Sequence, residues 1–307
     1  MQIITTTHYI LANSVRKQLV RPFLTLCIWS AVILLSGCQS GQLHQRGNSS
    51  VSSIQHQLYD DAEQAFSTGD YKKASEMYSQ MAETKPNDPI LMFRWAESLR
   101  MHNDFAKAIE IYDALLALQK DNPDAMEGKG LALVQMGEFD LAESLFTAIV
   151  NDNASRWRTI NALGVINALQ GDMEEARLYY DMAVDIDPKN PSILNNIALS
   201  LALSGEKQQA VSRMKEALAL LSPNDVRRKK IELNLALVYG VTGDMENAKH
   251  LLQNYLSDAA VFNNLGLYAS LNNDKALARS YLSKALAMHP VHYDKAWENL
   301  QAVDQAK

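Results

Sequence analysis

One repeated pattern constrains this chain more than any other feature. Between residues 55 and 292, a Gly or Asn turn residue is followed five positions later by an alanine, and apolar residues lie four and seven positions after that alanine. The turn residues are Gly69, Asn103, Gly137, Gly171, Gly205, Gly243 and Asn273. The alanines are Ala74, Ala108, Ala142, Ala176, Ala210, Ala248 and Ala278. Successive turn residues lie 34, 34, 34, 34, 38 and 30 residues apart, so an insertion of four residues before Gly243 is compensated after it. This period predicts a stack of helical hairpins that bury their apolar faces against one another.

The pattern resembles the tetratricopeptide repeat (TPR), which is a pair of antiparallel helices. The segments TGDYKKASEMYSQMAETKP and QGDMEEARLYYDMAVDIDP each contain the turn, the small residue where two helices approach closely, an aromatic residue and a proline stop. The resemblance implies an all-α fold, a TPR superhelical solenoid of about seven helix–turn–helix repeats over residues 55–292. Residues 293–307 have helical spacing and polar ends, so we expect a C-terminal capping helix and tail there.

The first 37 residues have the order of a lipoprotein signal peptide. Arg16, Lys17 and Arg21 precede an apolar run from Phe23 to Leu35, which is shorter than the roughly 18 residues of a membrane span. The segment LSGC that ends at Cys38 resembles a bacterial lipobox, and this resemblance implies cleavage before Cys38 and acyl chains on it. The alternative is a plain secreted protein that is cleaved nearby.

The residue that follows Cys38 bears on where the protein is delivered. By resemblance to bacterial lipoprotein sorting, Gln39 favours the outer membrane, where the protein would face the periplasm. Residues 38–54 are rich in Ser, Gly and Gln and have no apolar period, so we expect a flexible tether.

The sequence lacks the motifs of common catalytic and cofactor sites. It contains no P-loop, Gly-rich dinucleotide turn or HExxH zinc helix. In HPVH, a proline separates His289 from His292 and no third ligand lies nearby, so a surface loop is favoured over a metal site. Removing residues 1–37, which contain three basic and no acidic residues, changes the formal charge from −6 to −9, and this argues against nucleic-acid binding. We therefore expect a protein that is not an enzyme and that holds no cofactor or metal.

A row of asparagines is the candidate peptide-binding groove. When the repeats are aligned on their turn residues, repeats four to seven have asparagine at one or both of the same two positions of their first helices. These residues are Asn161, Asn195, Asn196, Asn234, Asn263 and Asn264. The row resembles the asparagine ladders by which some TPR proteins grip an extended backbone, since an amide both donates and accepts hydrogen bonds. The alternative is that these amides bond between neighbouring helices or face water.

The insertion SPNDVRRKKIELNLALVYG is the second distinctive region. We expect Asn224 or Asp225 to cap a helix that is about one turn longer than its counterparts. The basic residues that follow are Arg227, Arg228, Lys229 and Lys230. An exposed helix start is favoured over a partner contact, because four consecutive charges point around a helix rather than along one face.

Residues 195–271 resemble a narrower family. The segments NNIALSLALSGEKQQAVSRMKEAL, RRKKIELNLALVYGVTGDMENAKHLL and FNNLGLYASL are similar to the TadD family, the TPR lipoproteins of tight-adherence (Tad/Flp) pilus assembly. Asn273 departs from this family's usual turn glycine. The resemblance implies an adaptor that assists assembly of the pilus secretin at the outer membrane, much as a pilotin does. Its partners would be the secretin or another pilus component and, through acyl chains, the membrane.

Two other functions stay open. A type IV pilus pilotin has the same plan of lipid anchor and TPR array, and so does a periplasmic scaffold for peptidoglycan hydrolases or proteases.

Overall fold

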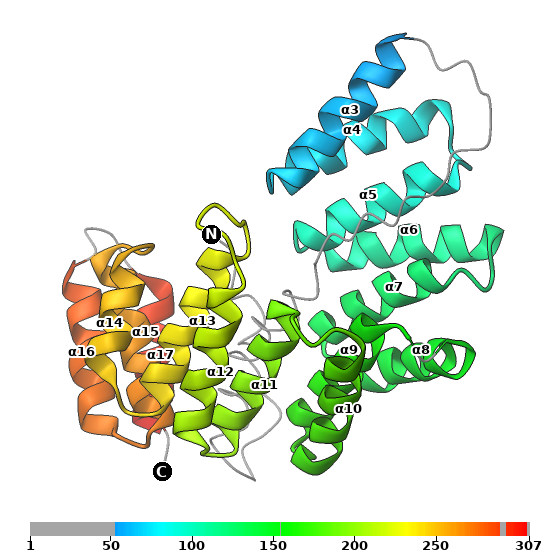
Figure 1. Cartoon of the computed structure of the whole chain (residues 1–307). Helices are drawn as coiled ribbons and strands as arrows, with labels where there is room; N and C mark the ends of the chain where they lie inside the picture. The colour runs from blue at the N-terminus through cyan, green and yellow to red at the C-terminus, as the bar shows by residue number, and fades with distance from the viewer. Residues whose placement is uncertain (1–52, 154, 289–292, 306–307) are drawn as a thin grey trace. The chain divides into compact units, whose positions relative to one another are not determined.

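The computed structural model describes residues 53–153, 155–288 and 293–305, and every regular element within these ranges is an α-helix (Figure 1). The described helices fall into two compact units. The N-terminal unit consists of α3 (Ser53–Ser67), α4 (Tyr71–Thr84), α5 (Pro89–Met101), α6 (Phe105–Leu118), α7 (Pro123–Met136), α8 (Phe139–Asp152), most of α9 (Trp157–Gln170) and the later part of α10 (Met173–Ile186). The C-terminal unit consists of the rest of α9 and α10 with α11 (Pro191–Leu203), α12 (Lys207–Ala219), α13 (Arg228–Val241), α14 (Met245–Gln253), α15 (Asp258–Leu271), α16 (Lys275–Met288) and α17 (Asp294–Gln305).

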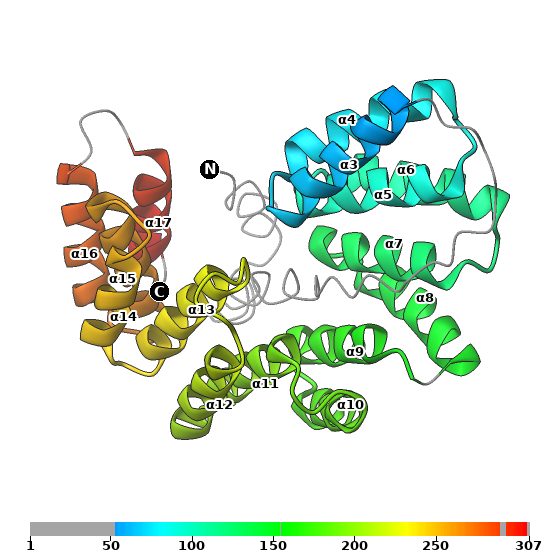
Figure 2. The same cartoon turned by 45° about the horizontal axis from the view of Figure 1, so that its top comes forward.

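Helices α3 to α16 form seven hairpins, and within each unit neighbouring hairpins stack. Helix α7 packs against both helices of the preceding hairpin, α5 and α6. In the C-terminal unit, α13 packs in the same way against α11 and α12, and α15 packs against α13 and α14 (Figure 2). Each of these three first helices therefore contacts both helices of the hairpin before it, as expected of stacked repeats.

Each hairpin turns at the residue that the sequence predicts. All seven turn residues have positive φ, from 59° at Asn273 to 92° at Gly243, a region that glycine enters freely and asparagine tolerates. The N–H of the following residue donates to the carbonyl five residues earlier, as from Asp70 to Ala65 at 2.9 Å, and the equivalent bond recurs in all seven hairpins. In five hairpins the residue after the turn is an aspartate whose carboxylate accepts a hydrogen bond from the backbone N–H three residues later. This bond caps the second helix.

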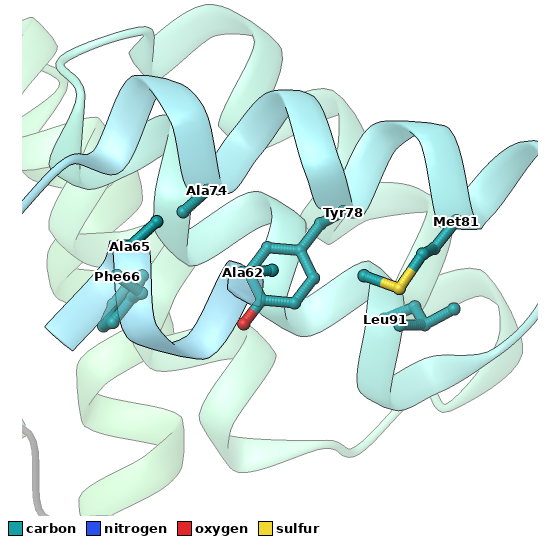
Figure 3. Close-up of a cluster of buried hydrophobic side chains, with 7 residues drawn as sticks. All are labelled: Ala62, Ala65, Phe66, Ala74, Tyr78, Met81 and Leu91. Carbon is teal, nitrogen blue, oxygen red and sulfur yellow. The ribbon is translucent and has the colours of Figure 1, made fainter. Parts of the chain in front are cut away.

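The predicted alanines lie where the two helices of a hairpin meet. All seven have no exposed surface, and the bulky residue four positions later is buried as well, as at Tyr78, Tyr112 and Phe146. Figure 3 shows the first cluster of this kind, in which side chains from α3, α4 and the start of α5 gather around Tyr78. Helix α7, the first helix of its hairpin, has Gly130 where it approaches α8 closely. A Cβ at Gly130 would lie 2.4 Å from the Phe146 ring on α8. The period of the sequence thus marks the packing surface.

The insertion lengthens a loop rather than a helix. The prediction of a longer helix capped by Asn224 or Asp225 is wrong, because α13 begins at Arg228 and has 14 residues, as α7 and α9 do. The extra residues lie between α12 and α13, where the Asp225 carboxylate accepts a hydrogen bond from the Arg227 backbone N–H at 2.8 Å and closes a turn ahead of the helix. The compensating shortening falls on α14, which has 9 residues where α12 has 13 and α16 has 14.

Helix α17 covers the last hairpin. It contacts α15 and α16, and its Ala296 and Val303 are buried. Val303 belongs to the same apolar cluster as Ala269 and Leu282. The predicted C-terminal capping helix is therefore confirmed.

Candidate interaction site

The predicted asparagines lie on the first helices of their hairpins, and most are buried. Asn161 is on α9 in the N-terminal unit, whereas the others are on α11, α13 and α15 in the C-terminal unit. Five side chains have exposed fractions between 0% and 3%, namely those of Asn161, Asn195, Asn196, Asn234 and Asn263. Asn264 is half-buried. The structure therefore divides the six residues into one accessible and five inaccessible side chains.

Three of these amides form a network, which we call the amide network and which consists of Asn195, Asn196 and Asn234. Asn195 Nδ2 donates to Asn196 Oδ1 at 3.0 Å, and Asn234 Nδ2 donates to Asn195 Oδ1 at 2.9 Å. Because Asn195 is on α11 and Asn234 is on α13, the second bond joins two successive hairpins. A buried amide needs such partners, since leaving one of its groups unsatisfied costs about 1–3 kcal/mol.

The other two asparagines of the C-terminal unit bond elsewhere. Asn263 Oδ1 on α15 accepts from Asn299 Nδ2 on α17 at 2.9 Å, and Asn264 Nδ2 donates to the Ala260 carbonyl of its own helix at 2.8 Å. Asn299 was not predicted, because it lies in the capping helix and outside the repeat register. The bonds from Asn234 to Asn195 and from Asn299 to Asn263 join different helices, which is the alternative that the sequence left open. Peptide binding by the row stays a prediction.

The N-terminal unit contains three buried or half-buried carboxylates that the sequence did not single out. Each pairs with an arginine: Arg94 Nε lies 2.9 Å from Glu63 Oε1, Arg100 donates to both oxygens of Glu97 at 2.9 and 2.8 Å, and Arg158 Nε lies 3.3 Å from Glu127 Oε1. Each also accepts a hydrogen bond from a hydroxyl, which belongs to Tyr78, Tyr112 or Thr159 respectively. The repeat period could have indicated two of these carboxylates, because Glu63 and Glu97 are 34 residues apart, as are Tyr78 and Tyr112.

We call Glu97, Arg100 and Tyr112 the Glu97 cluster. Burial alone would raise the pKa of Glu97, but the charge of Arg100 and its hydrogen bonds lower this pKa to about 2. Burial raises the pKa of Tyr112 well above its ordinary value, and the neighbouring carboxylate raises it further. Both groups therefore keep one protonation state across neutral pH, which suits a structural role better than a general acid or base. The ion pair lies within α5, and the Tyr112 hydroxyl bond to Glu97 links α6 to it.

The basic residues of the insertion are used largely within the loop. Arg227 donates to both oxygens of Asp225 at 2.9 and 2.7 Å, and hydrogen bonding by Arg227 lowers the pKa of that carboxyl. Arg228 donates to the carbonyls of Leu218 and Leu221 at 3.1 and 2.7 Å, so its charge lies at the C-terminus of α12. Lys229 Nζ lies 5.4 Å from the ring centre of Tyr255. These contacts support a structural role for the two arginines.

Several predicted features lie outside the described residues. They are the signal peptide (1–37), the tether apart from its last two residues, the lipidation site Cys38 and the histidines of HPVH. In the ranges that the structure describes, no three His, Cys, Asp or Glu side chains come together as a possible metal site. None of the described helices combines the length and apolar character that a membrane span requires.

Comparison with known proteins bears on the fold. Residues 59–125 and 127–191 match the tetratricopeptide repeat family. No curated protein matches the chain. A tetratricopeptide repeat protein from Parabacteroides merdae ATCC 43184 has a similar structure, with a TM-score of 0.54 and 14% identity over 83% of this chain and 100% of its own. A chain of the APC/C hetero-tetramer Cut9–Hcn1 has a TM-score of 0.59 and 18% identity over 79% of this chain and 48% of its own, so this chain spans about half its length.

Repeats of this family typically serve as non-catalytic scaffolds for protein interaction. The match covers four of the seven hairpins, and the remaining three have the same turns, packing alanines and stacking. Residues 59–125 and 127–191 therefore carry tetratricopeptide repeats, and the fold of the chain is the all-α TPR solenoid that the sequence predicts.

Proposed function

We propose that the protein is a lipid-anchored TPR adaptor that assists assembly of a Tad/Flp pilus secretin at the outer membrane. The observation that carries the proposal is the joint presence of stacked TPR hairpins and the LSGC sequence that ends at Cys38. The hairpins supply a surface for a protein partner, and two or three acyl chains on Cys38 would hold that surface firmly at a membrane. Delivery to the outer membrane rests on Gln39 and on the resemblance to TadD.

The proposed mechanism is capture of an extended secretin segment along the first helices of the C-terminal unit. The amide network supports this mechanism indirectly, because it ties α11 to α13 and so gives the partner a fixed face. Asn264 on the next first helix is half-buried, and its Nδ2 already bonds to the Ala260 carbonyl. Its side-chain oxygen is the group that would accept a hydrogen bond from a backbone N–H of the bound segment.

Photo-crosslinking in cells tests the proposal. A photoreactive amino acid at position 264 of the full-length protein should capture the secretin, whereas the same amino acid at the exposed Ser280 on the second helix α16 should not. Capture of a peptidoglycan hydrolase or a protease at position 264, with normal piliation after deletion of the protein, would show that the secretin role is wrong. Capture of a type IV pilus secretin would assign the pilotin function instead.

The lipid anchor is tested separately. The Cys38→Ser protein should leave the membrane fraction while its circular dichroism stays that of the wild type. Unchanged membrane fractionation of this variant would contradict lipidation at Cys38 without bearing on the partner.

A further inference from the structure

Helix α10 has an apolar stripe on the face that it turns to solvent. We define the α10 stripe as Leu178, Met182 and Ile186, whose exposed fractions are 58%, 42% and 38%. Residues four apart lie on one side of a helix, so the three side chains form a continuous row. The opposite side of the helix packs into the hairpin through Ala176 and Tyr180, which are buried. The stripe is therefore not part of the apolar surface that is buried within the hairpin.

The other hairpins show that the repeat does not require this stripe. Its residues lie two, six and ten positions after the packing alanine of their hairpin, and the same positions can be read on the other second helices. They hold Glu76, Gln80 and Thr84 on α4, Glu110, Ala114 and Leu118 on α6, Ser144, Ala148 and Asp152 on α8, Ser212 and Glu216 on α12 with Leu220 directly after it, His250 on the shorter α14, and Ser280, Lys284 and Met288 on α16. No other second helix among the described residues has three large apolar side chains there. Three such residues on one exposed face indicate a contact surface.

Acidic side chains border the stripe. Asp181 and Asp185 are exposed and follow its residues at helical spacing, so they lie along one edge of the row. Within the described residues, neither carboxylate forms an ion pair. The surrounding repeats are acidic as well, because residues 53–187 contain 24 acidic and 11 basic residues. A ligand for this face therefore needs apolar groups in a row and positive charge beside them.

We propose that the α10 stripe docks a basic amphipathic helix from a protein partner. Apolar residues of the partner helix would cover Leu178, Met182 and Ile186, while its lysine or arginine residues would meet Asp181 and Asp185. An anionic bilayer fits this face less well, since its surface repels carboxylates. A second copy that presents its own α10 stripe would bring like charges together. The surface lies on a second helix, so this proposal is independent of secretin capture along the first helices.

The test uses the full-length protein in nonionic detergent and three fluorescent peptides of equal length. The probe has lysine and leucine at amphipathic helical spacing, and the two control peptides have glutamate in place of lysine or the same lysines and leucines in shuffled order. Fluorescence anisotropy measures binding, and empty micelles give the background. We expect the lysine–leucine peptide to bind, and Leu178→Ser/Met182→Ser to weaken it at least about tenfold.

Two further variants distinguish peptide binding at the stripe from nonspecific binding. Asp181→Lys/Asp185→Lys should weaken the lysine–leucine peptide and bind the glutamate–leucine peptide instead. The control Leu118→Ser/Leu220→Ser changes exposed leucines at the register position of Ile186, at the end of α6 and directly after α12, and it should leave the affinity unchanged. Far-UV circular dichroism of each variant checks that the array is folded.

Four outcomes would overturn the proposal. The first is absence of binding to the wild type. The second is nonspecific binding, which would appear as equal binding of the three peptides or as equal weakening by the control variant. The third is a dimer in sedimentation equilibrium that Leu178→Ser/Met182→Ser converts to a monomer, which would assign the stripe to a second copy. The fourth is binding of the Cys38→Ser protein to phosphatidylglycerol vesicles that the same substitutions abolish, which would assign the stripe to the bilayer.

Discussion

Replacing Glu97 by glutamine should destabilise the N-terminal unit by roughly 3 kcal/mol at neutral pH. The carboxylate of Glu97 accepts two hydrogen bonds from Arg100 and one from Tyr112, and the Arg100 side chain is 4% exposed. Glutamine keeps the shape but removes the charge, so the guanidinium stays buried without its counter-ion. Loss of one partner from a buried pair costs about 3–5 kcal/mol.

The pKa of Glu97 gives a second route to the magnitude. This pKa is about 2 in the folded protein instead of 4.5, and at about 1.4 kcal/mol per pH unit the difference corresponds to roughly 3 kcal/mol. Because the folded-state pKa is the lower one, the stabilisation is complete above pH 4.5 and is lost as the pH falls towards 2. The difference in unfolding free energy between wild type and Glu97→Gln should therefore be largest at pH 7 and shrink steadily below pH 4.5.

Hydrogen exchange is the suitable assay, because hairpins in a repeat array can open separately and one global unfolding free energy need not describe them. Amide protection of α5, α6 and α7 should fall in Glu97→Gln at pH 7, whereas Glu76→Gln, which changes an exposed carboxylate on α4, should alter protection by less than about 0.5 kcal/mol. The combined variant Glu97→Leu/Arg100→Met/Tyr112→Phe should recover most of the loss, since it removes every charge and hydroxyl of the cluster. A loss below about 1 kcal/mol at pH 7, or one that does not change with pH, would refute the reasoning.

Three other substitutions test the packing and the polar networks. Gly130→Val should cost about 1–3 kcal/mol, because its Cβ would press on the Phe146 ring, and urea denaturation should show a lower midpoint. Asn234→Ala should cost about 1–3 kcal/mol by leaving the oxygen of Asn195 without this donor, and faster hydrogen exchange confined to α11 and α13 would identify the site. Arg228→Met should cost about 1–3 kcal/mol, because carbonyls at the end of α12 lose a charged donor, and a limited-proteolysis cut in residues 220–227 should appear earlier than in the wild type.

The sequence predicts the parts of the fold that recur. A turn residue with positive φ and an alanine with no room for a larger side chain impose the same demand in every hairpin, so both appear at a fixed spacing. The length of α13 was mispredicted for the opposite reason. The insertion occurs once, so the repeat pattern does not predict its conformation. The Asp225 carboxylate accepts hydrogen bonds from Arg227, ahead of the helix, rather than from backbone N–H groups in the first turn of the helix.

The sequence predicts that the asparagines lie on the first helices, but it does not predict their hydrogen bonds. Alignment of the repeats places asparagines at equivalent positions, yet an amide can bond to a neighbouring amide, to its own helix or to a ligand with similar energy. The structure contains the first two arrangements, in the amide network and in Asn264. The Glu97 cluster was missed because a charged residue on an amphipathic helix ordinarily faces solvent. Only the packing of α5 on α6 shows that Glu97 and Arg100 point inward.

The features that distinguish one hairpin from another are therefore the ones that bear on function. Side chains that recur in all seven hairpins already serve turning and packing, and a partner that recognised them could not choose a position along the array. The amide network, the arginines of the insertion and the α10 stripe each occur in one part of the chain. Two of these fix how neighbouring elements sit within the C-terminal unit, and both are satisfied by bonds inside the protein. The side chains of the α10 stripe are exposed and are not needed for packing within their hairpin. For that reason the stripe is the feature that we expect a partner to cover.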